Sequence, residues 1–494
     1  MKTRGATARA PGWLLLLGLT PGWLALSACA APSLLGESGD AGSARSDADA
    51  DADAGSDDGC PAWTVRCGVA CVDPFTSGTH CGACDRPCGA GTGCVDGSCL
   101  PSVPTTPSPA RCAAGGAPIR VGDGSDSACL GDLAATAFSR ALCACGDVVV
   151  TTTGALTVDG VDGRSGAPDA EGGSLGVNGS IRARGPLDAR GDVLTSDTLD
   201  AAAATTIGRN LYAAGLAASA AVDVGRDAYL ASLPAGTGPV TVAGTLHLPS
   251  RCDALPASVR VGACVEERVE RDEPCRCEPF GIEDTVDARS DPLRNDNVAA
   301  GLSPDTLAGP GASGRIDLPC GVYHLSRIEA GGPVTIAAHG RVALIVSGSI
   351  LADAPIAFVP DPGGSLDVIV GGTVLARAPL RLGAPDRPAA TRLWVGGVCA
   401  EDGDACGSDA ACCTGDCTAG RCVGDDTERW SVDLGPTVAF AARVAAPAGV
   451  LRLRGAQGVG GVLAGGLTAD GSASVTHDRA FDPVGDGCPP PPEP

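Results

Sequence analysis

Lysine, methionine and aromatic residues are almost missing from this chain. Lys2 is its one lysine, Met1 is its one methionine, and aromatic residues make up 3% of its 494 residues. The part beyond residue 28 therefore has no lysine to act as a base or to form a Schiff base. Because large rings are rare, the core must consist of many small aliphatic side chains, and we expect them in repeated layers.

Histidine is also scarce, and its spacing gives no metal motif. The five histidines, at 80, 247, 324, 339 and 477, form no H-x-x-x-H or H-E-x-x-H pair. A P-loop is absent because it requires lysine. We therefore expect no catalytic residue, no metal and no cofactor.

Positive charge is outnumbered by negative charge. The formal net charge is −23, and residues 1–28 hold three positive charges and no acid, so the remainder has −23 − 3 = −26. Such a chain repels nucleic acid, and we expect no nucleic-acid partner.

The first 28 residues have the organisation of a secretory signal. Lys2, Arg4 and Arg9 precede a leucine-rich stretch, which Thr20-Pro21-Gly22 interrupts, so it is too short for a stable membrane span. We expect cleavage after residue 28.

Leu26-Ser27-Ala28-Cys29 resembles a bacterial lipobox. The resemblance implies a diacylglyceryl thioether and an N-acyl chain on Cys29, with the membrane as the partner of this anchor. Ala30 favours sorting to the outer membrane, so we expect a surface-exposed outer-membrane lipoprotein. The alternative is an ordinary signal peptide, with Cys29 an unmodified thiol.

After the anchor, the sequence predicts a tether and then a cysteine-rich module. Residues 29–59 are small and acidic, which is typical of a disordered linker, and 100–111 form a proline-rich linker. Between them, residues 60–99 are too few to fold on a hydrophobic core alone. Their eight cysteines are Cys60, Cys67, Cys71, Cys81, Cys84, Cys88, Cys94 and Cys99.

We expect these eight cysteines to form disulfides of unknown pairing, as is usual in exported proteins. A metal cluster is the alternative, because Cys81 and Cys84 form a C-x-x-C pair. The stretch 71–84 resembles small cysteine-rich modules of exported proteins from GC-rich Gram-negative bacteria. On that resemblance His80 is a framework residue.

Internal repeats predict a mainly β fold. Residues 340–358 and 364–382 are identical at eight of 19 positions, with an offset of 24 residues and alternating apolar residues. Upstream, Gly191, Gly208, Gly225 and Gly244 recur at intervals of 17, 17 and 19. These periods indicate a β-solenoid with coils of about 17–24 residues, since stacked coils bury a continuous core. An antiparallel sandwich is the alternative.

We divide the rest of the chain by these patterns. Residues 132–142 carry apolar residues on one helical face, and Ile282–Arg289 suggests a second short helix. The expected parts are a helix with the first part of the solenoid (112–251), a charged excursion (252–319), the second part (320–397), an insert (398–429), the solenoid end (430–481) and a proline-rich tail (482–494).

Two C-x-C pairs, one in the first part of the solenoid and one in the excursion, point to a connection between distant segments. We expect Cys143 and Cys145 to lie near Cys275 and Cys277 and to staple the excursion to the start of the solenoid. The alternative is a metal site formed by the four thiolates.

The insert contains Cys399-x6-Cys406-x5-Cys412-Cys413-x3-Cys417-x4-Cys422, which resembles inhibitor-cystine-knot miniproteins. The resemblance implies the pairs Cys399–Cys413, Cys406–Cys417 and Cys412–Cys422. The insert interrupts the repeats at a coil corner, where extra chain is tolerated. It is either a rigid decoration or a binding knob.

Residues 319–328 and 461–480 resemble, loosely, uncharacterised β-solenoid domains of bacterial surface and pilus-associated proteins. The expected function is therefore a non-catalytic, lipid-anchored structural or adhesive protein, whose glycan or protein partner the sequence does not identify. The alternative is a polysaccharide-binding or polysaccharide-cleaving β-helix, although the clearest repeats hold no acids in register. In either case we expect His324 and His339 on the solenoid surface.

Overall fold

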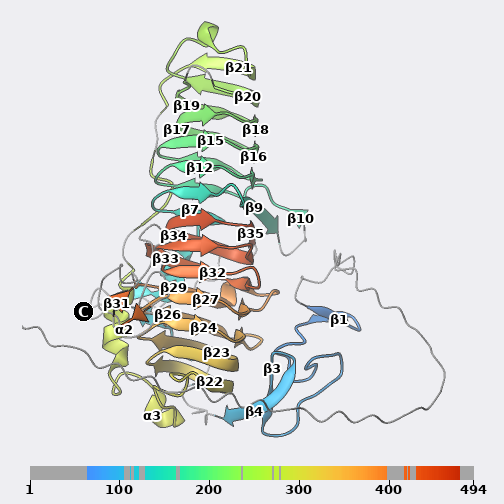
Figure 1. Cartoon of the computed structure of the whole chain (residues 1–494), viewed down its shortest axis with the longest axis vertical. Coiled ribbons are helices and arrows are strands. Elements are labelled where there is room, and N and C mark those ends of the chain that lie inside the picture. The colour runs from blue at the N-terminus through green and yellow to red at the C-terminus, as the bar shows by residue number, and fades with distance from the viewer. Residues whose placement is uncertain are drawn as a thin grey trace, which may run out of the picture. The chain divides into compact units, whose positions relative to one another are not determined.

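The computed structural model describes residues 64–104, 112, 116–121, 128–162, 167–234, 237–269, 272–277, 280–397, 417–419, 421–422 and 430–478. These residues form a β-solenoid of about 13 turns and a disulfide-rich region near the N-terminus (Figure 1). The chain is therefore mainly β, as the repeats predict.

The cysteine-rich module and the segment after it contain short strands and one helix. The strands pair as antiparallel hairpins, β1 with β2, β3 with β4 and β5 with β6. The bounds are β1 Val65–Cys67, β2 Ala70–Val72, β3 Thr92–Val95, β4 Ser98–Pro104, β5 Arg120–Val121, β6 Ala128–Cys129 and α1 Leu130–Ala137.

The first half of the solenoid follows directly. Its strands are β7 Leu142–Ala144, β8 Val148–Val150, β9 Ala155–Asp162, β10 Ala167–Pro168, β11 Leu175–Val177, β12 Ile181–Ala183, β13 Leu187–Ala189, β14 Val193–Thr195, β15 Thr198–Ala201, β16 Thr205–Ile207, β17 Leu211–Ala218, β18 Val222–Val224, β19 Ala228–Ser232, β20 Val240–Leu248 and β21 Val259–Glu266, with a 3₁₀ turn at Cys252–Ala254.

The second half comes after two helices, α2 Ile282–Ser290 and α3 Asn297–Ala300. Its strands are β22 Ala312–Leu325, β23 Ile328–Val346, β24 Ile350–Ala352, β25 Ile356–Pro360, β26 Ser365–Val370, β27 Val374–Ala376, β28 Leu380–Gly383, β29 Thr391–Val395, β32 Val432–Leu434, β33 Ala439–Leu453, β34 Gln457–Ala469 and β35 Ser472–Asp478; a 3₁₀ turn covers Pro388–Ala390, and β30 Cys417–Thr418 pairs with β31 Arg421–Cys422.

Parallel pairing between successive coils builds the core. Strands β11, β12 and β13 pair with β14, β15 and β16 of the next coil. In β12 the side chains of Ile181 and Ala183 are buried, whereas Arg182 between them is exposed. Alternation of this kind sends every second side chain inward. The inward residues of successive coils stack in register, as in the row Leu142, Leu175, Val193, Leu211, Ala228 and Leu246.

The order of coils along the stack is not the order of the chain. The first coil, β7–β9, pairs with β11–β13 on one side and with β34 and β35 on the other. The two halves therefore meet at β7–β9, β21 lies at the far end of the first half, and β22 lies at the far end of the second (Figure 1). Residues 267–311 return from one end of the stack to the other.

A second apolar cluster lies outside the solenoid core. The outward side chains Ile345, Ile369, Trp394, Ala445 and Leu463 occupy one register row on successive strands. They are covered by Phe138, which follows α1, by Phe280, and by Ile282 and Val286 of α2. The rings of Phe138 and Phe280 lie 5.8 and 5.7 Å from that of Trp394.

Two segment boundaries differ from the sequence analysis. The first helix ends at Ala137 rather than continuing to Leu142, because Leu142 pairs as a strand residue with Leu175 and Val462. The helix covers an outer face of the solenoid.

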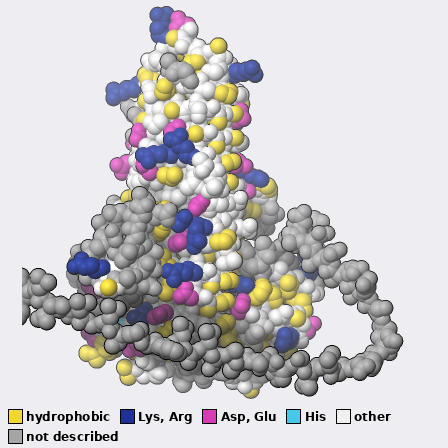
Figure 2. Space-filling view, viewed as in Figure 1, with side chains coloured by type: hydrophobic (Ala, Val, Ile, Leu, Met, Phe, Trp, Pro, Cys, Tyr) yellow, Lys and Arg dark blue, Asp and Glu magenta, His cyan; other side chains and the backbone are white. Residues whose placement is uncertain are grey.

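The expected excursion is shorter at both ends, since β21 continues the first half to Glu266 and β22 begins at Ala312. Charged residues of the last coil of the first half, such as Arg260, are exposed. Charged side chains also lie on the visible outer surface of the rest of the stack (Figure 2). From the sequence we assigned this coil to the excursion, because charged stretches are typical of loops.

Candidate functional site

The returning segment is attached to the first coil by two disulfides. Cys143 pairs with Cys275 and Cys145 with Cys277, so the structure brings together the two C-x-C pairs as the sequence analysis expected. The side-chain amide of Asn178 donates to the Cys275 carbonyl oxygen and accepts from the Cys275 amide, both at 2.9 Å. Arg140 donates to the carbonyl oxygen of Pro274. These contacts fix the segment beside the junction of the two halves.

Gly176 makes room for this attachment. A Cβ atom at that position would lie 2.9 Å from Sγ of Cys275 and 3.3 Å from Sγ of Cys143. Gly176 is in register with Cys143 on the neighbouring strand. A side chain on its outward face would therefore push against the disulfide.

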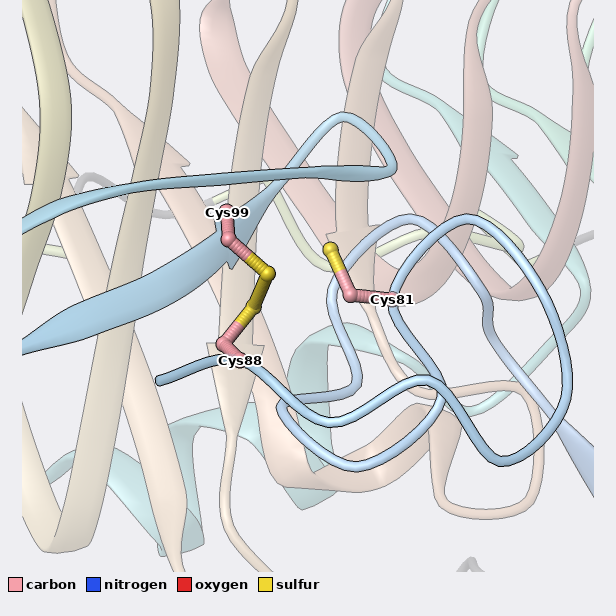
Figure 3. A group of neighbouring side chains, drawn as sticks. All are labelled: Cys81, Cys88 and Cys99. Atoms are coloured by element: carbon pink, nitrogen blue, oxygen red, sulfur yellow. A yellow bond between two sulfur atoms is a disulfide. The ribbon is translucent and has the colours of Figure 1, made fainter. Parts of the chain in front are cut away.

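The cysteine-rich module is also oxidised where the structure describes it. Its disulfides are Cys67–Cys84, Cys81–Cys94 and Cys88–Cys99, and Cys71 is disulfide-bonded as well. The sulfur atoms of Cys81, Cys88 and Cys99 lie within 4.8 Å of one another, the spacing of a metal site (Figure 3). Zinc binds thiolates, and all three cysteines are committed to disulfides, so the disulfide interpretation fits better than the metal cluster. His80 accepts a hydrogen bond from the Asp85 amide within this framework.

The module contacts the second half of the solenoid. Strand β4 pairs in parallel with β22, and the guanidinium of Arg381 lies 3.6 Å above the ring of Phe75. Asp73 and Asp96 flank the same guanidinium at 3.9 Å. The shallow hollow beside this contact has room for about one water molecule at most. It is therefore a packing interface rather than a ligand cavity.

His339 lies between two carboxylates from neighbouring coils. Its Nε2 atom is 3.0 Å from Oδ1 of Asp317, and its Nδ1 atom contacts Asp361. Asp317 also accepts from Ser102 at 2.6 Å and from Arg315 at 2.9 Å. Hydrogen bonds to Asp317 and Asp361 raise the pKa of His339 to about 9. The imidazole is therefore protonated at neutral pH, when it is a cation between two anions and not a general base.

His324 forms the second arrangement with catalytic residue types. Its Nε2 atom is 3.0 Å from Oγ of Ser347, and burial lowers the pKa of His324. The expectation of a surface position is wrong, because Asn297 and the 296–308 segment cover His324, which is 7% exposed.

A catalytic Ser–His pair needs free backbone amides nearby, which stabilise the oxyanion that forms during acyl transfer. The amides of Ser347 and Gly348 instead donate to Leu325 and Ser326. This geometry favours a structural role for the pair.

Two short glycine motifs are also structural. Gly172–Gly176 has G-x-S-x-G spacing, but the Ser174 hydroxyl donates to Glu171 and accepts from the Asp192 amide at a coil corner. Gly309–Gly314 has G-x-G-x-x-G spacing, but it leads into β22 rather than into a helix N-terminus that could hold phosphate. Sequence spacing alone could not separate these from functional motifs.

Two further histidines, His247 and His477, make packing and backbone contacts rather than contacts typical of a catalytic site. The His247 ring stacks on Tyr229, which stacks on Tyr212, with centroids 4.3 and 4.7 Å apart. His477 is buried, and its Nδ1 donates to the Gly460 carbonyl oxygen at 3.0 Å.

A buried ion pair lies on the outer face of the second half. Asp367 and Arg392 are 0% and 2% exposed and form two hydrogen bonds of 2.6 and 2.7 Å. Trp394 donates to the same carboxylate at 3.2 Å. Sequence analysis missed this pair, because a residue that faces outward in a solenoid is normally exposed.

Several expected site residues lie outside the described residues. These are Cys29, Cys60, Cys399, Cys406, Cys412 and Cys413, so the lipid site and the three knot pairs stay predictions. Cys417 and Cys422 face each other as register partners of β30 and β31.

In the described part of the chain, none of the helices has both the length and the apolar character needed to cross a bilayer. No family model, curated protein or solved structure matches this chain.

Proposed function

We propose that this chain is a non-catalytic structural or adhesive protein, anchored at the cell surface by lipid on Cys29. The observation that most supports a structural role is the double disulfide from Cys143 and Cys145 to the returning segment. It braces the place where the two half-solenoids meet. Disulfides of this kind persist in the cell envelope and outside the cell, which agrees with the leader sequence.

The surroundings of the histidines also support a non-catalytic role. His339 is held as a cation between Asp317 and Asp361, and the His324–Ser347 pair faces amides that are already bonded. Neither arrangement offers a free base beside an oxyanion site.

The polysaccharide alternative has one candidate surface, the column Tyr212, Tyr229 and His247. Sugars pack on the faces of aromatic rings, but these rings are stacked with interplanar angles of 2° and 9°. Their faces are thus largely occupied by one another. A glycan array probed with the unaltered protein and with Tyr229→Ala tests this alternative, which requires binding that the substitution abolishes.

Metabolic labelling with an alkyne fatty acid tests the proposed anchor. We expect label on the unaltered chain in the membrane fraction, and neither label nor membrane retention for Cys29→Ala. An unlabelled chain that is soluble after cell lysis would contradict the proposal.

A further inference from the structure

Two large aliphatic side chains protrude from the segment that covers the β22 end of the solenoid. Leu293, in the loop between α2 and α3, is 93% exposed, and Val298 of α3 is 82% exposed. Single exposed aliphatic residues are common on protein surfaces, but these two lie five residues apart on one short segment.

This segment is ordered by hydrogen bonds, so the two side chains are held outward. The Asn297 side chain bonds both the carbonyl oxygen and the amide of His324, at 2.7 and 2.9 Å. The Asp296 carboxylate accepts from the Val322 amide at 2.9 Å. Asn295 donates to the carbonyl oxygens of Arg289 and Asp291, which closes the loop that carries Leu293.

The cysteine-rich module, which follows the tether in the chain, contacts the solenoid at the same end. Strand β4 of the cysteine-rich module pairs with β22, and residues 30–63 precede the first described residue of that module. A flexible linker of this length has a root-mean-square span of about 30 Å. The opposite end, at β21, is about 60 Å away along a stack of about 13 turns. A lipid on Cys29 can therefore bring the β22 end to a bilayer far more easily than the β21 end.

We propose that the β22 end rests on the bilayer, with Leu293 and Val298 in the lipid interface. This inference rests on the proposed lipid anchor. Two aliphatic side chains bind a bilayer weakly by themselves, but a tethered contact acts at a high effective concentration. Acidic residues outnumber basic ones in the segment, since Asp287, Asp291, Asp296 and Asp305 stand against Arg289 and Arg294. The contact is therefore apolar rather than an electrostatic attraction to anionic lipid. Anionic lipid should weaken it.

The near absence of lysine makes a direct test available. In the lipidated chain the N-terminal amine is acylated, so one introduced lysine is the single site for an amine-reactive dye. Arg294→Lys places the donor dye beside Leu293, and Arg251→Lys places it at the β21 end, on a side chain that is 79% exposed. Each full-length lipidated variant is reconstituted into phosphatidylcholine vesicles that contain an acceptor-labelled lipid.

We expect energy transfer from Arg294→Lys to be at least about threefold greater than from Arg251→Lys. The two dyes lie near opposite ends of the solenoid, so their distances from the bilayer differ by most of its length. Adding Leu293→Asp and Val298→Asp should remove most of this difference. Val265→Asp is the matched control, because Val265 is an exposed aliphatic residue of β21. Phosphatidylglycerol in the vesicles should lower transfer from Arg294→Lys.

Equal transfer from both dye positions on vesicle-bound protein would overturn the inference while leaving the anchor intact. A difference that both aspartates leave undiminished would overturn it as well, because the tether alone would then explain the orientation. A difference that appears only with co-purified proteins and not with pure lipid would assign the patch to a protein partner and also refute the lipid contact. A chain purified from cells that neither carries lipid nor floats with vesicles would instead refute the proposed function.

Discussion

Cys143 and Cys275 are joined across 132 residues, and the bond connects the first coil of the solenoid to the segment that leaves the last coil of the first half. The first coil is also where the C-terminal strands β34 and β35 pair. Three distant parts of the chain thus meet in one place. This junction makes two half-solenoids into one continuous stack.

The disulfides Cys143–Cys275 and Cys145–Cys277 are expected to be strongly redundant in their effect on stability. Each closes a loop of 132 residues, and either alone keeps that loop closed. Replacing Cys143 and Cys275 by alanine should therefore cost less than about 1.5 kcal/mol of unfolding free energy, whereas removing all four cysteines should cost about 5 kcal/mol. Urea unfolding of the unaltered protein, of a variant lacking either disulfide and of the variant lacking both measures this. Equal and additive losses from the two pairs would show that strain or packing, and not loop closure, dominates.

Gly176→Ala should destabilise the protein by about 1–3 kcal/mol, because the new Cβ lies 2.9 Å from Sγ of Cys275. Gly309→Ala is the matched control, since a Cβ there meets no atom within 4 Å. Thermal unfolding compares the two variants. If Gly176→Ala is as stable as Gly309→Ala, the space between residue 176 and the Cys143–Cys275 disulfide is large enough for a methyl group, and the account of this contact is wrong.

The local features of the solenoid could be predicted from the sequence. The offset of 24 residues between the clearest repeats is the offset of their strand register, as in Val342 with Leu366 and Ile350 with Val374. Residues 393–397 (LWVGG) also resemble residues 368–372 (VIVGG), and Leu393 pairs with Val368. Repeats predict these contacts because each coil must place its apolar residues above those of the coil before it.

The stacking of the C-terminal coils onto the first coil could not be predicted in the same way. Leu463 meets Cys143 in one register row, but the sequences around them show no repeat signal. Inward positions of any two coils are small aliphatic residues, so many stacking orders satisfy the same pattern. The C-x-C pairs predicted one long-range contact, between the returning segment and the first coil. They did not predict the pairing of β34 with β7.

Arg392→Met should be strongly destabilising, because it leaves the Asp367 carboxylate buried with only Trp394 as a described side-chain donor. Loss of one partner of a buried ion pair costs about 3–5 kcal/mol. The double change Asp367→Leu with Arg392→Met removes both charges and should recover much of that loss. Chemical denaturation of the single and double variants tests this. A double variant no more stable than the single one would contradict the account.

His339 should make stability fall with rising pH on the alkaline side. Its pKa rises from 6.5 to about 9 in the folded chain, so its contribution is complete below 6.5 and is lost as pH increases through about 9. The side chain is 41% exposed, and after allowance for solvent screening we expect a loss of about 1 kcal/mol.

His339→Gln should lack this slope, and Asp361→Asn should reduce it. Unfolding free energies at about pH 6 and about pH 10 measure the effect. Identical slopes in the unaltered protein and His339→Gln would show that the two carboxylates do not hold the proton.

The central claim is that this disulfide-braced solenoid is displayed on the cell surface by a lipid on Cys29. Protease treatment of intact cells, followed by detection of the chain in the membrane fraction, tests it most directly. We predict that added protease removes the chain from intact cells, and that Cys29→Ala leaves no chain on the cells to be removed. Full protection in intact cells, with degradation only after the envelope is broken, would contradict surface display.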